Sequence, residues 1–331
     1  MSERLTSPKR WRLLAAGLAV GGLAAWLVFT TTDIPALVQI LKNDIDYPLA
    51  GTALLVYGLF FVGKAVRWRY LLSPLIALPV PRLTAYVLVG YAGNVLLPFQ
   101  AGEIARGYLL SKHHPVKAAA ALSGIAVEKA LDFLALLALL VWALWTVRAP
   151  SPLAESVLVS LAASLSLLGL LLLALLIRPE ATGAAIDRAL GYCPERLATR
   201  LGPPIHDALS GLTALRQGSL LWRLVLTSLI TWGIMLAALS LTLQAVQLEV
   251  PLAIAVVVMV LAAVGLALPT SPGFIGTLQA AFVLGMVPFG VAQEAAVAAS
   301  LLYQVLTTVP PLLAGALCLL WLRSSQAGSS A

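Results

Sequence analysis

Long apolar segments alternate with short polar connections along almost the whole chain, and this pattern predicts helices that cross a membrane. A crossing helix needs about 20 mostly apolar residues. Segments of this kind occupy residues 11–30, 47–63, 118–147, 153–177, 220–243 and 291–322. We therefore expect an all-α polytopic membrane protein with about six full transmembrane helices.

Two further apolar segments are interrupted near their middle. Residues 83–112 break at Pro98, and residues 252–287 break at Pro269. Both breaks read Leu-Pro-x-x-x-Gly-x-Ile, with the same spacing in each copy. A broken helix at membrane depth frees backbone groups, which must face protein or a water-lined cavity. We therefore expect two re-entrant hairpins, and paired breaks of this kind indicate the binding site of a transporter.

The distribution of charge gives these segments an orientation. Basic residues precede the first span, whereas the connection after it, expected to be an external loop, carries three aspartates and one lysine. Because Lys and Arg favour cytoplasmic connections, both termini are expected in the cytoplasm. Three crossings in each half predict an inverted repeat. The expected parts are a first repeat at 1–147 with the hairpin 83–112, a second repeat at 148–323 with a cytoplasmic loop 178–217 and the hairpin 252–287, and a polar tail at 324–331.

Composition excludes a water-soluble globule, because 60% of the residues are hydrophobic and only 11% are charged. The net charge of +7 comes from basic residues in the connections, so orientation in the membrane explains it and nucleic acid is not an expected partner. Cys193 and Cys318 imply no disulfide framework. His113 and His114 lie in a basic connection without carboxylate or cysteine partners at ligand spacing. We expect no metal, no cofactor and no catalytic residue.

The first hairpin supplies five candidate substrate-binding residues. Pro98 and Gly102 form the break, and Asn94 beside it suits hydrogen bonds to exposed carbonyls. Glu103 and Arg106 are three residues apart and share one face of the helix that follows. Arg106 would hold a head-group phosphate and Glu103 would position it, since charges inside membrane segments are costly. Alternatively, Glu103 caps free N–H groups and Arg106 extends to the cytoplasmic surface.

The segment 118–147 carries three charged candidates, Glu128, Lys129 and Asp132. The two carboxylates are four residues apart and share one helical face, with Lys129 adjacent. They suit a proton or cation site, or would neutralise Arg106 and Lys129. The alternative is a buried salt-bridge network that fixes the first hairpin to this segment.

The second hairpin supplies Pro269, Ser271, Pro272, Gly273 and Gln279 as candidates. Ser271-Pro272-Gly273 reads as a helix start, with Ser271 as the cap and Pro272 at the first helical position. A helix that begins at mid-membrane directs free N–H groups toward the break, where an anion such as phosphate would fit. A packing kink is the alternative. Gln279 suits a local hydrogen bond to exposed carbonyls.

These motifs resemble the flippase-like family, also called the lysylphosphatidylglycerol synthase transmembrane region family. Relatives usually have arginine where this chain has Gln100 and Lys129, glycine at Phe274 and glutamate at Gln279, which weighs against charge chemistry in the second hairpin. The resemblance covers nearly the whole chain and rests on Asn94-x-x-Leu97-Pro98-x-x-Ala101-Gly102-Glu103-x-x-Arg106, Val127-Glu128-Lys129-x-x-Asp132 and Leu268-Pro269-x-Ser271-Pro272-Gly273-x-x-Gly276.

The resemblance implies a bacterial inner-membrane protein that moves a phospholipid, or a hopanoid or isoprenoid-type lipid, between leaflets. In larger relatives the membrane domain is fused to a soluble aminoacyl-transferase, which is not expected here. Two alternatives stay open. One is an intramembrane enzyme that acts on a lipid-linked substrate, with Glu128 or Asp132 as the base. The other is a non-transporting subunit of a lipid or glycan pathway, and a homo-oligomer or a pathway enzyme is the protein partner to consider.

Overall fold

The computed structural model describes most of the chain, namely residues 8–97, 100–147, 218–267 and 271–327 and scattered residues between 156 and 202. The expected span at 153–177, the loop at 178–217 and the tail at 324–331 lie wholly or partly outside the described residues. Pro98 and Pro269 also lie outside them.

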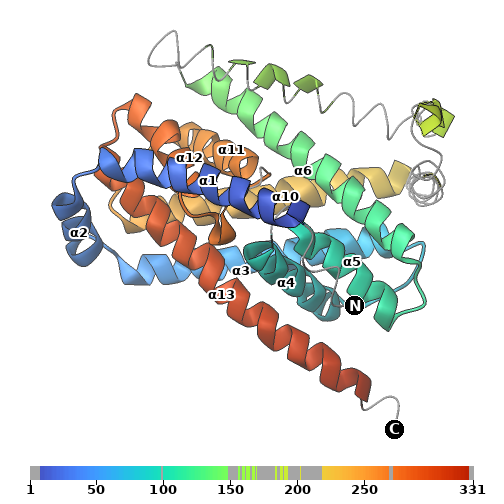
Figure 1. The fold of residues 1–331 in the computed structure, drawn as a ribbon. Coiled ribbons are helices and arrows are strands. Elements are labelled where there is room, and N and C mark those ends of the chain that lie inside the picture. Colours follow the sequence, from blue (N-terminus) through green and yellow to red (C-terminus); the bar gives the residue numbers. More distant parts are fainter. Residues whose placement is uncertain are drawn as a thin grey trace.

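Every regular element in the described ranges is a helix, as the sequence predicted (Figure 1). The α-helices are α1 (Pro8–Thr30), α2 (Ile34–Asn43), α3 (Tyr47–Leu72), α4 (Val80–Leu96), α5 (Ala101–His113), α6 (Ala118–Thr146), α10 (Gly218–Ala245), α11 (Leu252–Ala267), α12 (Thr277–Met286) and α13 (Gln293–Ala327). Two short 3-10 turns, η4 (Pro272–Phe274) and η5 (Val287–Phe289), flank α12.

Three described helices, α3, α10 and α13, are long and apolar enough to cross a membrane. The bent pair formed by α1 and α2, which meet at 91°, makes a fourth if the pair is one span. The 29-residue α6 also has the length to cross, although three charged residues lie near its middle. The chain is therefore a multi-pass α-helical membrane protein.

The first hairpin consists of α4 and α5, which run antiparallel. The Tyr86 hydroxyl lies 2.8 Å from Nδ1 of His113 at one end, and Gly93 packs against Gly102 near the other. With 17 and 13 residues, the two helices are about 25 Å and about 20 Å long. Each is shorter than the ~30 Å hydrocarbon core, so the pair has the geometry expected of a re-entrant hairpin.

The second hairpin consists of α11 and α12, which also run antiparallel. Gly265 faces Thr277 near the tip, and Gly285 faces Val258 at the open end. These helices have 16 and 10 residues, again too few to cross the hydrocarbon core. Both breaks predicted from the sequence therefore fold as helical hairpins.

The tip of the second hairpin differs from the helix start predicted at Ser271. The segment after Ser271 forms only the single turn η4, and the Ser271 hydroxyl donates to the carbonyl of Ile275 at 2.7 Å instead of capping a helix. The α-helix starts at Thr277. Its N-cap is Gly276, whose backbone φ of 85° suits glycine and whose N–H donates to Oε1 of Gln279 at 2.7 Å.

The connection between α1 and α3, expected to be an external loop, contains the helix α2. Asp33 caps α2 by accepting a hydrogen bond from the N–H of Ala36 at 3.2 Å, and Leu37 is buried against α13 and its neighbours. Asp46 caps the next helix in the same way, through the N–H of Leu49 at 2.9 Å. Two of the aspartates that marked a polar connection are thus helix caps.

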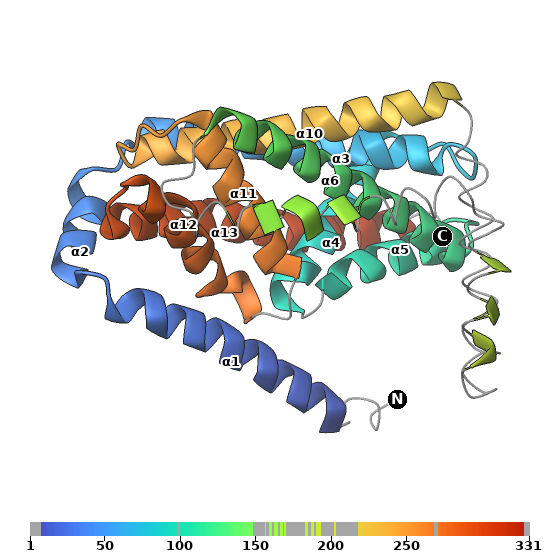
Figure 2. The same cartoon turned by 90° about the horizontal axis from the view of Figure 1, so that it is seen from above.

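Helices α3 and α10 lie side by side and antiparallel over their whole length (Figure 2). At one end the N–H of Asp46 donates to the carbonyl of Ala245 at 2.8 Å. At the other end the Arg223 guanidinium lies 5.9 Å from the centre of the Tyr70 ring. An apolar core surrounds each hairpin, and α6 and α10 contribute buried side chains to both cores.

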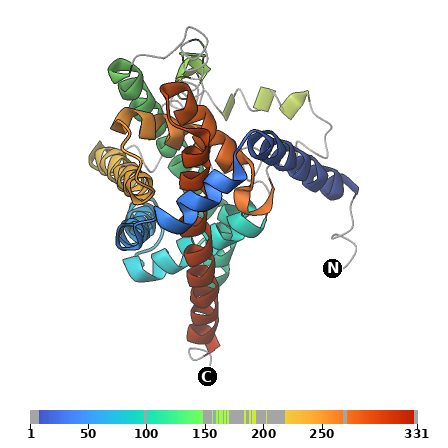
Figure 3. The ribbon, with the colours of Figure 1, turned by 90° about the vertical axis from the view of Figure 1, so that its left-hand side faces the viewer.

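Helix α1 packs mainly against the second hairpin. Gly21 approaches Ser271 and Gly276 so closely that a Cβ at either glycine would overlap the opposing atoms. Toward its N-terminal end, α1 diverges from the other helices (Figures 2 and 3). The tip of the second hairpin therefore holds α1 together with α13, whose Gln293 donates to the carbonyl of Val28 at 3.1 Å.

Candidate functional site

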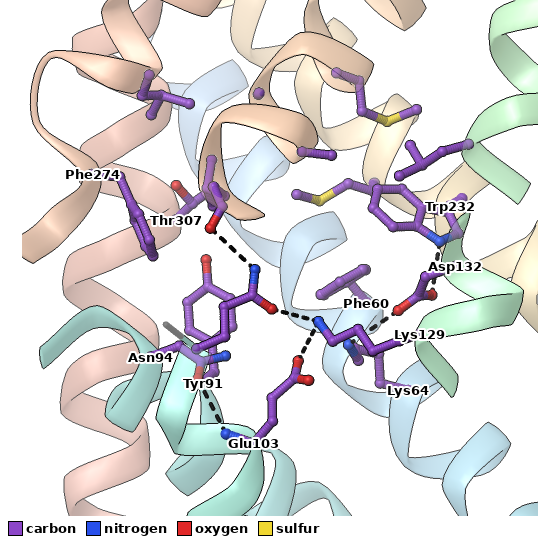
Figure 4. Close-up of a pocket in the computed structure, with 18 of the residues that line it drawn as sticks. Phe60, Lys64, Tyr91, Asn94, Glu103, Lys129, Asp132, Trp232, Phe274 and Thr307 are labelled. Atoms are coloured by element: carbon purple, nitrogen blue, oxygen red, sulfur yellow. Dashed lines mark hydrogen bonds and ion pairs between the residues drawn. The ribbon is translucent and has the colours of Figure 1, made fainter. Parts of the chain in front are cut away.

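A cavity of about 250 Å³ lies where the two hairpins meet, bordered by α3, α6, α10 and α13 (Figure 4). Its lining consists of Phe60, Lys64, Tyr91, Asn94, Gln100, Glu103, Lys129, Asp132, Phe133, Leu136, Trp232, Met235, Met259, Ala262, Ala263, Leu266, Phe274, Leu278, Tyr303, Thr307 and Thr308. The expectation that both hairpins contribute to one pocket is thus met in this structure.

Charged and apolar residues of the cavity lining come from different helices. The four charged side chains come from α3, α5 and α6, and every lining residue of the second hairpin is apolar or aromatic. Tyr91, Tyr303, Thr307 and Thr308 add hydroxyl groups from α4 and α13. The cavity is therefore amphipathic, with a charged wall beside the first hairpin and an apolar wall formed by the second.

Lys129 is the most accessible cation in the cavity wall, with 43% of its side chain exposed. Its ammonium lies 2.8 Å from the Glu103 carboxylate and donates to Oε1 of Gln100 at 2.6 Å (Figure 4). The other end of the Gln100 carboxamide donates to the carbonyl of Leu266 at 3.1 Å. A chain of polar contacts thus runs from α6 through the tip of the first hairpin to the second hairpin.

Behind this wall, the Glu128 carboxylate is buried among three cations. Its oxygens lie 2.9 Å from Nζ of Lys64, 3.1 Å from Nη2 of Arg67 and 2.8 Å from Nη2 of Arg106. The Arg106 guanidinium also stacks 4.4 Å from the centre of the Trp68 ring. Glu128 therefore joins α3, α5 and α6 through charge pairs shielded from water.

Asp132 forms the part of the same network that reaches the cavity. It accepts hydrogen bonds from Nη1 of Arg67 at 2.7 Å and from Nε1 of Trp232 at 2.9 Å, and Nζ of Lys64 lies 3.7 Å away. Nη1 of Arg67 also donates to the hydroxyl of Ser228 at 3.0 Å. These bonds extend the network to α10, so four helices meet at one charged centre.

The structure separates the sequence-predicted residues into those that reach the cavity and those that do not. Asn94, Glu103, Lys129 and Asp132 line it. Among the described residues, Gly102, Arg106, Glu128, Ser271, Gly273 and Gln279 are not part of this lining. Pro98 and Pro269 lie outside the described residues, as does the side chain of Pro272.

Arg106 pairs with Glu128 on α6 at 2.8 Å, which is the salt-bridge alternative considered from the sequence. It does not extend to the cytoplasmic surface, because only 2% of it is exposed. Nor does it face the main cavity, because Glu128 and Trp68 occupy its guanidinium. Glu103 likewise meets Lys129 and not the free N–H groups of its own helix. Arg106 and Glu103 therefore attach the first hairpin to α3 and α6.

The two amides beside the breaks have local hydrogen-bonding roles, but their partners are not the ones expected. Asn94 accepts a hydrogen bond from the N–H of Glu103 at 3.2 Å, so its partner is a donor and not a carbonyl. Gln279 accepts from the backbone at the start of α12 and donates to Gln304 at 2.6 Å. Gln304 in turn donates to the carbonyl of Gly273 at 2.7 Å. Both amides hold a hairpin tip in shape.

Lys64 and Arg67 belong to the site but were not among the predicted residues. The span predicted at 47–63 ends just before them. In the structure α3 continues to Leu72, and Arg67 is completely buried. Two buried carboxylates on α6 need cationic partners, and this requirement could have pointed to nearby lysine and arginine residues such as Lys64 and Arg67.

Gly102 serves packing within the first hairpin. A Cβ at this position would overlap the carbonyl oxygen of Gly90 and the backbone of Gly93 and Asn94. Backbone atoms in two packed helices do not yield easily, so only glycine allows this approach.

We expect Gly102→Ala to lower the free energy of unfolding by about 1–3 kcal/mol, the usual cost of overpacking a filled site. The matched control is Gly58→Ala in α3, where an added Cβ meets no atom within 4 Å. That change replaces a poor helix former and is expected to be neutral or stabilising by up to about 1 kcal/mol. Thermal unfolding in detergent compares the two variants, and equal midpoints would contradict the packing role.

The fold and the site together define a multi-pass membrane protein in which two broken-helix hairpins enclose an amphipathic, charged cavity. The family described as "Lysylphosphatidylglycerol synthase TM region" matches residues 14–315. The chain belongs to this family, which confirms the resemblance found in its motifs. A comparison with curated proteins found no match.

Proposed function

We propose that this protein moves a phosphate-bearing lipid between the leaflets of a bacterial cytoplasmic membrane. The observation that carries the proposal is the cavity between the hairpins, which presents lysine ammonium groups on one wall and apolar side chains on the other. A lipid has the same two-part chemistry, with a charged head group joined to hydrocarbon. A pocket built from paired broken helices is also the usual site of substrate binding in transporters.

Lys129 and Lys64 are the cations that would meet the phosphate. Lys129 is the more accessible of the two, and its ammonium can exchange the Glu103 carboxylate for a phosphate oxygen without leaving the cavity. The volume of about 250 Å³ is below the ~300–1,000 Å³ of pockets that enclose drug-sized ligands. The site therefore suits a head group, with the lipid chains outside it.

Alternating access is the mechanism that we propose for the movement. The expected inverted repeat pairs α3 with α10 and the first hairpin with the second, and the antiparallel packing of α3 on α10 supports this relation. In this proposal both termini are cytoplasmic, and one hairpin opens to each side of the membrane. Separation of the tips would expose the cavity to one side at a time.

The surroundings of the two buried carboxylates favour transport over the enzymatic alternative. A general base must be able to take a proton from its substrate. Glu128 is surrounded by three cations, and Asp132 is held by Arg67 and Trp232. A carboxylate held by cations in this way is a poor proton acceptor.

Reconstitution tests the proposal directly. Vesicles that contain the purified protein and a fluorescent phosphatidylglycerol are treated with a membrane-impermeant quencher, which reports the rate of exchange between leaflets. We expect exchange to be at least ten-fold faster than in protein-free vesicles. The zwitterionic phosphatidylcholine probe should move more slowly, because its own ammonium group is repelled by the lysines. Equal rates for phosphatidylglycerol with and without protein would refute the proposal for this lipid class.

A further inference from the structure

Gln100 occupies an unusual position between the two hairpins. It precedes the first residue of α5 in a left-handed conformation, with φ of 51°, which few residues other than glycine adopt. Its side chain makes no cap bond to its own helix. Instead, Oε1 accepts from Lys129 on α6, and Nε2 donates to the carbonyl of Leu266 on α11. One planar carboxamide therefore contacts both the cavity's accessible cation and the opposite hairpin.

We propose that Gln100 is a positioning residue that couples the state of Lys129 to the contact between the two hairpin tips. The inference rests on the proposed function, because it assigns an anionic head group to Lys129. Gln100 itself need not touch the lipid. It acts by holding Lys129 on one side and Leu266 on the other.

The coupling follows from the geometry of the amide. Its oxygen and nitrogen belong to one rigid plane, so a rotation that breaks one hydrogen bond displaces the other. A phosphate oxygen is a stronger acceptor for an ammonium group than a neutral amide oxygen. When phosphate draws Lys129 away, Gln100 loses the partner that fixes its plane, and the bond to Leu266 is weakened with it. Binding and opening are then linked in both directions.

The separation of the tips is measured with spin labels at two exposed positions, Leu96 at the end of α4 and Ile275 after η4, which are 62% and 55% exposed. Cys193 and Cys318 are first replaced by serine so that only the introduced cysteines react. Electron paramagnetic resonance is recorded in nanodiscs of phosphatidylcholine, with and without phosphatidylglycerol. We expect phosphatidylglycerol to lengthen the distance in the otherwise native protein by several ångström.

Gln100→Met keeps the size of the side chain and removes both hydrogen bonds. It should lengthen the tip separation in the absence of phosphatidylglycerol. Addition of the lipid should then change this separation little. Gln100→Glu retains an acceptor for Lys129 but loses the donor to Leu266, so it should also lengthen the separation. A second label pair, Leu96 and Ile104, lies within the first hairpin and should show no change in any variant.

The outcomes separate this inference from the proposed function. If the wild-type protein exchanges phosphatidylglycerol between leaflets but both variants keep the wild-type tip distance, the coupling role of Gln100 is refuted and transport stands. The same conclusion follows if the lipid lengthens the distance equally in wild type and Gln100→Met. If the wild-type protein exchanges no lipid and its tip distance is the same with and without phosphatidylglycerol, the transport proposal and the coupling are both refuted.

Discussion

Glu128→Gln is expected to remove a large part of the folding stability of this protein. Lys64, Arg67 and Arg106 share the Glu128 carboxylate, and Asp132 is the other buried carboxylate of the described network. The variant leaves two buried cations, Arg67 and Arg106, and the partly buried Lys64 with a single remaining carboxylate. Removal of one partner from a buried ion pair costs about 3–5 kcal/mol, because the remaining charge stays out of water without compensation. Stability of a typical domain is only about 5–15 kcal/mol.

The measurement is the yield of monodisperse protein after detergent extraction, together with its thermal unfolding midpoint. Glu103→Gln is the matched control, since it removes the same charge from a pair whose lysine is 43% exposed and should cost only about 0–1 kcal/mol. The double variant Glu128→Gln with Arg106→Met removes the unpaired cation as well and should recover part of the loss. A Glu128→Gln protein as stable as the Glu103→Gln control would contradict the role assigned to the buried network.

Lys129→Met is expected to reduce exchange of phosphatidylglycerol between leaflets by roughly 10–100-fold while the fold survives. A hydrogen bond to a charged group contributes about 1.5–3 kcal/mol. Each 1.4 kcal/mol corresponds to about ten-fold in an equilibrium. The ion pair with Glu103 is partly exposed to the cavity, so its loss changes the free energy of unfolding little.

The control for this prediction is Lys112→Met, which removes an exposed lysine from the last turn of α5. It should retain the wild-type exchange rate and thermal stability. Exchange is followed with the same fluorescent lipid and impermeant quencher in vesicles of equal protein content. Undiminished exchange by Lys129→Met would contradict the role of Lys129 in the site and the assignment of the charged wall to phosphate binding.

The sequence predicted the hairpins well because their cause is local. A proline within an apolar run cannot continue the backbone hydrogen bonding, and a glycine nearby permits close packing of the returning helix. Gly102 shows this in the structure, where it touches the backbone of α4, and Gly265 faces Thr277 across the second hairpin. Of the residues that the motifs predicted to bind substrate, Asn94, Glu103, Lys129 and Asp132 line the cavity, and their binding of a substrate stays a prediction.

The rest depended on contacts between distant segments. Lys64 and Arg67 were not predicted to belong to the site because nothing near them in the chain is acidic, and only the packing of α3 on α6 brings them to Glu128 and Asp132. For Arg106 the sequence left phosphate binding and pairing with a carboxylate of α6 both open, because that partner is 22 residues away. Gln100 differed only from the arginine usual in relatives, and its role could not be predicted because its two partners lie on separate helices.

Helix α1 belongs to the first half of the chain by sequence, yet it is seated on the tip of the second hairpin through Gly21 and Gly276. Because the backbones of α1 and the second hairpin touch at Gly21 and Gly276, a tilt of α12 would also move α1. The unit that would shift during a transport cycle therefore combines helices from opposite ends of the chain. This unit follows the steric fit of α1 on the second hairpin and does not coincide with either half of the expected repeat.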